Sequence, residues 1–589
     1  MKLSVIALDY DGTIATDWGV DSEVRQAIAY ARTSGITVLL VTGRILAALR
    51  HVAGDLHFVD GVVAENGAVV HFPDSEHTTL LAPRVAQRLR SEIEARRITS
   101  QPGDCLIDAA AADSHQLLTI IQQLELPYVL VFNRARVMVM PQGVSKATGL
   151  QTALDMLRLS PRNTVAIGDA ENDHELLRLS ELGAAVAWGS GVLQASADAV
   201  VAGNGPRDVA TYIRALVDAA RLPLPARARR YLRLGHTEDG REFSLAVKGR
   251  NVLVTGDAKS GKSWITGLLC EQLILHGYCV CVLDPEGDYR SLEGLPGVTV
   301  LGGEDPPPTP RELLRALRYP DRSVVIDLSR LPQDEKIGYI RAALPAVNHM
   351  RRRTGLPHRI VLDEAHYFLH DADARQLLDL ERNGYTVVTY CASRLPPELL
   401  AATEVMLVTC ESNHDELEAL YARCQTCQAH LDVAAWRRLL CHVGVGQAVA
   451  LPITEEAGGE LKLFNIGRRL TPHVRHREKY VDVPVTEPKA FAFGTDPSGR
   501  ARTLRQFVAM LERQSSTMLR GYLQRGDFSR WIGDVFGDRA LASEIRAQEQ
   551  RYTGGEDLDT IPEIVDAIRG RYDLSSDDPV PAGAPAQAA

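Results

Sequence analysis

Long apolar runs are missing from this sequence. No stretch reaches the roughly 18 consecutive apolar residues that a membrane-spanning helix needs. The opening MKLSVIALDYDGT has neither the apolar segment nor the cleavage pattern of a secretory signal, and we interpret it as a buried strand. Cysteine is also scarce. Nine cysteines at irregular spacings in 589 residues argue against a disulfide framework and indicate a reducing, cytoplasmic setting.

An excess of positive charge is absent as well. The net charge of −10 excludes a globally basic nucleic-acid surface, although a local basic patch remains open. No internal repeat is visible, and the composition, 45% hydrophobic and 24% charged, is that of an ordinary globular protein. A chain of 589 residues is too long for one core, so roughly three or four domains are expected.

Strand-like and helix-like runs alternate through two stretches, 1–220 and 236–470. This alternation predicts an α/β fold in each, with a parallel sheet between helices. We interpret the basic, proline-bearing residues 221–235 as a linker, with the end of a surface helix as the alternative. Residues 471–574 begin extended and continue with helical periodicity, which predicts a small, mostly helical module. The Pro/Ala-rich residues 575–589 predict a disordered tail.

Two carboxylates follow the first predicted strand, Leu3–Leu8. Asp9 and Asp11 come directly after it, and Gly12 allows a sharp turn. Ligands of open α/β sheets bind at the carboxyl ends of strands. One carboxylate there can attack a phosphorus centre while the other protonates the leaving oxygen. Alone, this pattern also fits a plain turn or a calcium loop.

Three later segments supply the other groups that phosphoryl chemistry needs. Thr42, after a predicted strand, offers a hydroxyl to phosphate oxygens. Lys146 offers a positive charge to offset the aspartate and the phosphoryl group. Asp169 and Asp173 follow another predicted strand, and such carboxylates suit Mg²⁺, a hard cation that prefers oxygen ligands.

Together these motifs resemble the haloacid dehalogenase-like phosphatases. The match lies in the IIB branch, which has a cap inserted between the second and third motifs and includes Cof-like and sucrose-phosphatase-like enzymes. The resemblance covers residues 1–220 and implies a Rossmann-like domain with an inserted α+β cap at about 80–140. It implies that Asp9 is the nucleophile and Asp11 the general acid/base. It also implies phosphate contacts from Thr42 and Lys146 and Mg²⁺ ligands from Asp9, Asp11, Asp169 and Asp173.

The cap also contains candidates for substrate contact. For each of them a solvated surface position is the favoured interpretation: His115, Asn133, Arg134 and Arg136.

A glycine-rich segment after the predicted strand Asn251–Thr255 matches G-x-x-x-x-G-K-[ST] in full. The loop amides of this motif cradle phosphates, Lys262 reaches the β/γ oxygens, and Ser263 can hold Mg²⁺. The helix-like run Trp264–His276 follows, as the motif requires. The predicted ATP-binding residues are Gly256, Asp257, Ala258, Lys259, Ser260, Gly261, Lys262 and Ser263.

Asp363 and Glu364 follow the predicted strand Arg359–Leu362. Beside an intact phosphate loop, Asp363 is expected to hold Mg²⁺ through water at the ATP site, and Glu364 to polarise the attacking water. The alternative for such a pair is a charge pair at a helix N-terminus.

With Asp284–Tyr289 and DEAH at Asp363–His366, these motifs resemble the HerA/FtsK-like (DUF87-type) P-loop ATPases. The resemblance implies a RecA-like fold and, for many members, hexameric rings that move nucleic acid. The segment Thr389–Arg394 departs from the group because it lacks the expected polar sensor, often Gln, and Ser393 or Arg394 is the candidate replacement.

A zinc site is a weaker alternative to buried thiols at Cys424, Cys427, Cys441 and His442. The basic segment His473–Lys479 fits a phosphate or nucleic-acid contact, or a solvated loop.

Three functions remain open on these residues. The first is a Mg²⁺-dependent hydrolase of a phosphorylated small molecule, such as a sugar phosphate, fused to an ATP-binding and ATP-hydrolysing domain. The second is an ATP-driven DNA or RNA translocase whose phosphatase acts on nucleic-acid ends or nucleotides, for example in defence. The third is an ATP-controlled scaffold or switch. A homo-oligomer follows from the second resemblance, and no membrane partner is expected.

Overall fold

The computed structural model describes residues 1–572 apart from short gaps, and every structural statement below refers to the described residues. The gaps are 17–18, 220, 223–229, 248–250, 370–373, 381, 426–432, 453–461, 473–480, 482–483, 486, 495–498, 537 and 556–559. The predicted tail, the basic segment His473–Lys479 and residues 223–229 of the predicted linker therefore lie outside the described residues.

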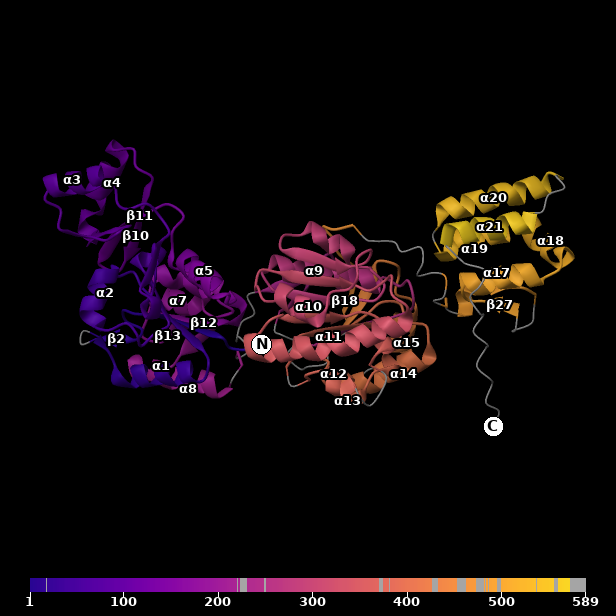
Figure 1. The fold of residues 1–589 in the computed structure, drawn as a ribbon, viewed down its shortest axis with the longest axis horizontal. Coiled ribbons are helices and arrows are strands. Elements are labelled where there is room, and N and C mark those ends of the chain that lie inside the picture. The colour runs from indigo at the N-terminus through magenta and orange to yellow at the C-terminus, as the bar shows by residue number, and fades with distance from the viewer. Residues whose placement is uncertain are drawn as a thin grey trace.

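The chain forms three bodies in a row (Figure 1). The N-terminal body contains an eight-stranded sheet in the order β14-β13-β12-β1-β4-β5-β6-β7, in which β6 runs antiparallel to its neighbours β5 and β7 and the other neighbouring strands pair in parallel. Its strands are β1 Val5–Asp9, β4 Thr37–Val41, β5 Gly61–Ala64, β6 Val69–Phe72, β7 His77–Leu80, β12 Thr164–Gly168, β13 Leu182–Val186 and β14 Ala199–Val201. Its helices are α1 Ser22–Thr33, α2 Leu46–Ala53, α5 Lys146–Leu157, α6 His174–Leu179, α7 Gly191–Ser196 and α8 Pro206–Ala219.

Strand β1 shows why this sheet is buried on both faces. Ile6 and Leu8 point into a core shared with α1, α2 and α8, whereas Val5 and Ala7 point into a second core shared with α5, α6 and α7. Because side chains alternate along a strand, a continuous apolar run suits a parallel sheet that has helices on both sides. The only polar side chain of β1, Asp9, stands at its carboxyl end.

An α+β insertion lies between β7 and α5. Its antiparallel sheet has the order β10-β11-β9-β8 and packs against two helices, as the expected cap requires. Its elements are α3 Gln87–Ala95, β8 Ser100–Pro102, β9 Ile107–Ala110, α4 Ser114–Gln123, β10 Tyr128–Asn133 and β11 Arg136–Pro141.

The central body is built on an eleven-stranded sheet in the order β16-β15-β25-β24-β23-β17-β22-β21-β18-β20-β19. The strands from β23 to β19 run parallel, and β24, β25, β15 and β16 extend the sheet in antiparallel fashion. Strand β15 begins at Tyr231, so residues 231–235 of the predicted linker belong to this sheet.

The strands of the central body are β15 Tyr231–Thr237, β16 Glu242–Ala246, β17 Val252–Thr255, β18 Val280–Asp284, β19 Val298–Gly302, β20 Ser323–Asp327, β21 Arg359–Leu362, β22 Tyr385–Thr389, β23 Val405–Val408, β24 Gln447–Pro452 and β25 Lys462–Ile466. Its helices are α9 Lys262–Leu275, α10 Pro310–Ala316, α11 Gln333–Thr354, α12 Ala374–Leu377, α13 Pro397–Ala401, α14 His414–Gln425 and α15 Val433–Cys441.

The C-terminal body is mostly helical and packs around clustered aromatic rings. Phe507 lies 4.7 Å from Trp531 and 5.5 Å from Phe528, centroid to centroid. Its elements are β26 Phe491–Ala492, β27 Arg500–Ala501, α17 Leu504–Arg513, α18 Ser516–Arg525, α19 Asp527–Trp531, α20 Arg539–Thr553 and α21 Thr560–Tyr572. The predicted fold class, two α/β units followed by a helical module, is confirmed. No helix in the described ranges is both long and apolar enough to cross a membrane.

The N-terminal and central bodies share a buried polar interface. The Nδ1 atom of His358 accepts a hydrogen bond of 2.7 Å from the backbone N–H of Cys279, so its Nε2–H donates to the Oδ1 atom of Asn163 at 3.0 Å. Burial lowers the pKa of His358 to about 3, which keeps the imidazole neutral. Nearby, the hydroxyl of Tyr278 donates to the carboxylate of Glu181 at 2.9 Å. These contacts tie the two bodies together through groups that water does not reach.

Candidate functional site

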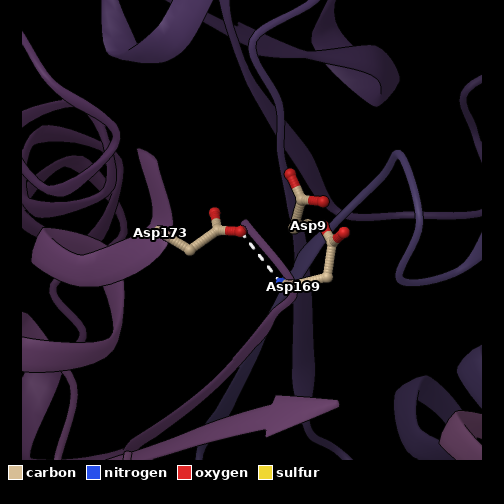
Figure 2. Close-up of side chains that lie close together, drawn as sticks. All are labelled: Asp9, Asp169 and Asp173. Atoms are coloured by element: carbon tan, nitrogen blue, oxygen red, sulfur yellow. Dashed lines mark hydrogen bonds between the residues drawn. The ribbon is translucent and has the colours of Figure 1, made fainter. Parts of the chain in front are cut away.

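Three carboxylates meet at the carboxyl edge of the N-terminal sheet (Figure 2). Asp9 ends β1, Asp169 follows the neighbouring strand β12, and Asp173 lies in the short helix Glu171–Asp173. Their ligand oxygens lie within 4.8 Å of one another, and all three residues are buried. The backbone N–H of Asp169 donates to Asp173 at 3.0 Å, which fixes the second carboxylate relative to the first. The structure therefore brings together three of the four predicted Mg²⁺ ligands of this site.

Lys146 lies among these carboxylates. Its Nζ donates to Asp9 Oδ1 and to Asp173 Oδ1, both at 2.6 Å. The residue begins α5, where Ser145 forms a capping box that holds the start of the helix. Although burial favours the neutral amine, the Asp173 and Asp9 carboxylates raise the pKa of Lys146. Its charge is therefore held beside Asp9, as the prediction requires.

The cluster fits a divalent cation. Burial raises the pKa of Asp9 well above its usual value, the Asp173 charge adds to this rise, and Lys146 opposes it. Three buried carboxylates face one buried amine, and buried charge without a partner is costly. A hard cation that prefers oxygen ligands would relieve this imbalance. Asp173 is held in place by two backbone amides, whereas the carboxylates of Asp9 and Asp169 meet side-chain donors, which can move aside for an ion. Asp9 and Asp169 are therefore the better placed ligands.

Asp11 is not part of the cluster. Its carboxylate pairs with Arg44, whose Nη2 lies 2.6 Å from Oδ1 and whose Nε lies 2.8 Å from Oδ2. The Asp11 side chain is 43% exposed, whereas Asp9 is buried. Thr42 is fully buried after β4, and its Oγ1 accepts from the Arg44 amide at 3.1 Å. Asp11 thus lies beside the cluster and not in it. This position suits a general acid/base, which needs less shielding from solvent than a metal ligand does.

Two residues near the cluster were not predicted. Thr13 Oγ1 donates to Asp9 Oδ2 at 3.3 Å. Its position in the Asp-x-Asp-Gly-Thr run could have identified it as a site residue. Glu65, buried at the end of β5, accepts backbone N–H bonds from Asp104 and Cys105 at 2.9 and 2.8 Å. It thereby holds the loop between β8 and β9 of the cap against the end of β5, a contact that the sequence alone did not indicate.

Of the four cap residues that are candidates for substrate contact, two lie near the aspartate cluster and two lie farther away. Arg134, at the tip of the β10–β11 hairpin, donates from Nη2 to Asp169. Asn133 is next to it in the same hairpin. Arg136 pairs with Asp108 on β9 and does not reach the cluster, and His115 is exposed on α4.

The phosphate loop of the central body has the predicted strand–loop–helix context. It connects β17 to α9, and β17 lies between β22 and β23 in the sheet. Lys262 Nζ donates to the carbonyl oxygens of Gly256 and Asp257 at 2.9 and 2.8 Å, so the lysine is folded over its own loop. Ser263 Oγ donates to Asp288 Oδ2 at 2.5 Å. Asp288 was not predicted, although it lies in the acidic Asp284–Tyr289 segment.

Asp284 explains the position of Asp288. Its buried carboxylate accepts the backbone N–H groups of Gly287, Asp288 and Tyr289 at 2.7, 3.1 and 2.9 Å. Burial raises the pKa of Asp284 to about 8. The resulting turn after β18 points Asp288 at the first turn of α9.

Asp363 and Glu364 follow β21, two strands from β17, and both are buried. The hydroxyl of Tyr289 donates to Asp363 Oδ1 at 3.4 Å. Glu364 has a φ of +45° and lies 3.5 Å from His366, whose Nδ1 contacts Thr389 at 3.1 Å. The predicted carboxylate pair therefore lies at the same sheet edge as the phosphate loop.

Ser393 and Arg394 are the two candidates for the missing polar sensor, and both lie in other surroundings. Ser393 donates from its backbone N–H and Oγ to Glu416, and Arg394 is exposed. Thr389, at the end of β22, is the polar group that contacts His366.

The zinc hypothesis receives no support in the described part of the chain. Among the described residues, the only group of three or more His, Cys, Asp or Glu side chains close enough to share a metal ion is the aspartate cluster. Cys427 and the side chain of Cys424 lie outside the described residues.

Comparison with known proteins separates the same two regions. Residues 6–93 and 85–213 match the family model of haloacid dehalogenase-like hydrolases, and residues 246–351 match that of the central domain of helicase HerA. A phosphoglycolate phosphatase of Methanopyrus kandleri is 31% identical over 235 residues, which cover 36% of this chain and 97% of that protein. A second, from Natronomonas pharaonis, is 31% identical over 219 residues, covering 33% and 89%. The solved structure of a haloacid dehalogenase-like hydrolase from B. subtilis shares 20% identity over 36% of this chain and 99% of its own, with a TM-score of 0.32.

Proposed function

The chain belongs to the haloacid dehalogenase-like hydrolases, and we propose that its N-terminal body is a Mg²⁺-dependent phosphatase of small phosphomonoesters. The observation that carries the proposal is the buried group of Asp9, Asp169 and Lys146 at the carboxyl edge of the sheet. Two relatives are phosphoglycolate phosphatases, so a short phosphorylated acid is the first substrate to test, ahead of a sugar phosphate.

In the proposed mechanism, Asp9 attacks the phosphorus atom and the ester bond breaks. The leaving oxygen takes a proton from Asp11, which gives a phosphorylated Asp9 and the free alcohol. Asp11 then removes a proton from water, which attacks the phosphorus and restores the Asp9 carboxylate. Lys146 and Thr42 offset and hold the charge of the phosphoryl oxygens. Mg²⁺ held by Asp9 and Asp169 would draw the phosphoryl group toward the nucleophile by neutralising its charge.

Magnesium should stabilise the protein in the absence of nucleotide. Because only the folded cluster binds the ion, Mg²⁺ at about 100 times its Kd is expected to add about 2.7 kcal/mol. Thermal denaturation with and without Mg²⁺ measures this as a rise in melting temperature. Asp169→Asn should abolish the rise. Asp108→Asn, which changes a cap carboxylate outside the cluster, should retain it, and an equal rise in both variants would place the ion elsewhere.

We further propose that the central body, about residues 236–470, binds and hydrolyses ATP. The loop from Gly256 to Ser263 supports phosphate binding, and Asp288 on Ser263 supports a Mg²⁺ site completed by Asp363. In this proposal Glu364 polarises the attacking water. The C-terminal body, about residues 471–574, remains without an assigned activity.

A nucleic-acid motor is the second candidate, favoured by the match of residues 246–351 to the HerA central domain. A motor should hydrolyse ATP faster with duplex DNA, and the stimulation should fall steeply between about 50 and 200 mM salt as phosphate contacts are lost. ATP hydrolysis with and without DNA over this range measures it. An unchanged rate, together with no retention on DNA, would leave a phosphatase fused to a DNA-independent ATPase.

A further inference from the structure

The cap places one positively charged side chain, that of Arg134, beside the aspartate cluster. Asn133 and Arg136 are the last pair of the β10–β11 hairpin, so Arg134 stands in its two-residue turn, with a φ of +53°. From there its guanidinium reaches Asp169, on the opposite domain. Gly12 makes this approach possible, because a Cβ atom at that position would lie 2.9 Å from Arg134 Nη2.

This guanidinium remains accessible although its partner is buried. The Arg134 side chain is 59% exposed, whereas that of Asp169 is 1% exposed. Asp169 is also one of the two carboxylates best placed to hold Mg²⁺. An ion held there would offset the Asp169 charge, and the guanidinium would then stand beside the reaction centre with its donors available. Arginine presents a planar fork of N–H donors that matches a carboxylate.

The cap packs closely against the domain that carries the cluster. On β11, Met140 Sδ accepts from Asn66 Nδ2 at 3.2 Å, and Met138 Sδ would lie 3.4 Å from a Cβ atom on Gly43, which follows Thr42. Two buried acceptors, the Oδ1 atoms of Asn133 and Asn172, have no hydrogen-bond partner. The cap side of the cluster is thus apolar apart from one accessible cation and a few polar atoms. Such a surface suits a short leaving group that carries a negative charge.

We propose that Arg134 is a specificity-determining residue that binds the carboxylate of a short phosphorylated acid while Asp9 attacks its phosphorus. The inference rests on the phosphatase function proposed above and adds to it the class of substrate. Arg134 contributes to binding the carboxylate end of the ester and takes no part in the transfer of the phosphoryl group.

The test compares two esters of similar size, 2-phosphoglycolate and ethyl phosphate, which lacks the carboxylate. In the full chain with Mg²⁺, Arg134→Gln should lower kcat/KM for 2-phosphoglycolate by about 10- to 100-fold, the range for a hydrogen bond to a charged group. It should change kcat/KM for ethyl phosphate by less than about threefold. Arg136→Gln is the matched control, because Arg136 lies in the same hairpin but pairs with Asp108, and it should affect neither ester.

A binding measurement tests the same point without turnover. Calorimetry on full-length Asp9→Asn protein with Mg²⁺ should show 2-phosphoglycolate binding weakened by about 10- to 100-fold when Arg134→Gln is added, and ethyl phosphate binding unchanged. Equal losses for both esters, or a change only in the Mg²⁺ requirement, would overturn the inference, because Arg134 would then act through Asp169. If the unmodified protein hydrolyses no phosphomonoester, the proposed function fails, and calorimetry still decides whether Arg134 recognises the carboxylate.

Discussion

Asp9→Asn should lower phosphatase turnover by at least about 10⁴-fold, the scale seen when a catalytic nucleophile is removed. The asparagine amide cannot attack phosphorus and loses the charge that pairs with Lys146 at 2.6 Å. ATP hydrolysis should remain within about twofold, because the phosphate loop lies on a different sheet and binding sites without shared contacts behave independently. Release of phosphate from an aryl phosphate and from ATP, measured on the same preparation, tests both statements.

The substitution is nearly isosteric, and circular dichroism should show an unchanged fold. Asp108→Asn serves as a control for the loss of one carboxylate outside the cluster. Phosphate release from the aryl ester that persists in Asp9→Asn protein would show that another group is the nucleophile.

Lys262→Ala should have the reverse effect. It is expected to lower ATP hydrolysis by about 100-fold or more, as for other groups that stabilise charge in a transition state, and to leave the phosphatase rate unchanged. Lys262 Nζ donates to the carbonyl oxygens of Gly256 and Asp257, and in the proposed ATP complex it exchanges them for the β/γ oxygens. Single-turnover hydrolysis of ATP measures the loss.

Asp9→Asn is the natural control for Lys262→Ala, since each variant should retain the activity that the other loses. An ATPase rate that is unchanged in Lys262→Ala protein would exclude the loop as the site of hydrolysis. A parallel loss of phosphatase activity would instead indicate that the two bodies depend on each other.

Much of the site was predictable because it follows strand order. Asp9 and Asp169 come directly after buried apolar runs, and the carboxyl ends of parallel strands meet at one edge. The same reasoning placed Asp363 beside the phosphate loop, and both family resemblances drawn from these motifs are confirmed. The roles of the individual residues stay predictions.

What escaped prediction depends on contacts between distant segments. The pairing of Asp11 with Arg44, and of Arg134 with Asp169, joins residues 33 and 35 positions apart through turns whose direction no local pattern reveals. Asp288 is oriented by amides that bind Asp284, an arrangement that composition cannot indicate. Strand ends also differ slightly from prediction: β1 is Val5–Asp9, whereas the predicted strand is Leu3–Leu8.

The hydrogen bond between Asn163 and His358 limits how the two chemistries can be connected. Asn163 immediately precedes β12 and His358 immediately precedes β21, so both strands start at the shared interface and lead away from it to Asp169 and Asp363. At about 3.3 Å per residue, Asp169 lies about 20 Å and Asp363 about 16 Å along the chain from the junction. The two centres therefore lie at strand ends that point away from the interface that joins the bodies. A structural change at one centre would reach the other along these strands, through the buried polar contacts at their starting points.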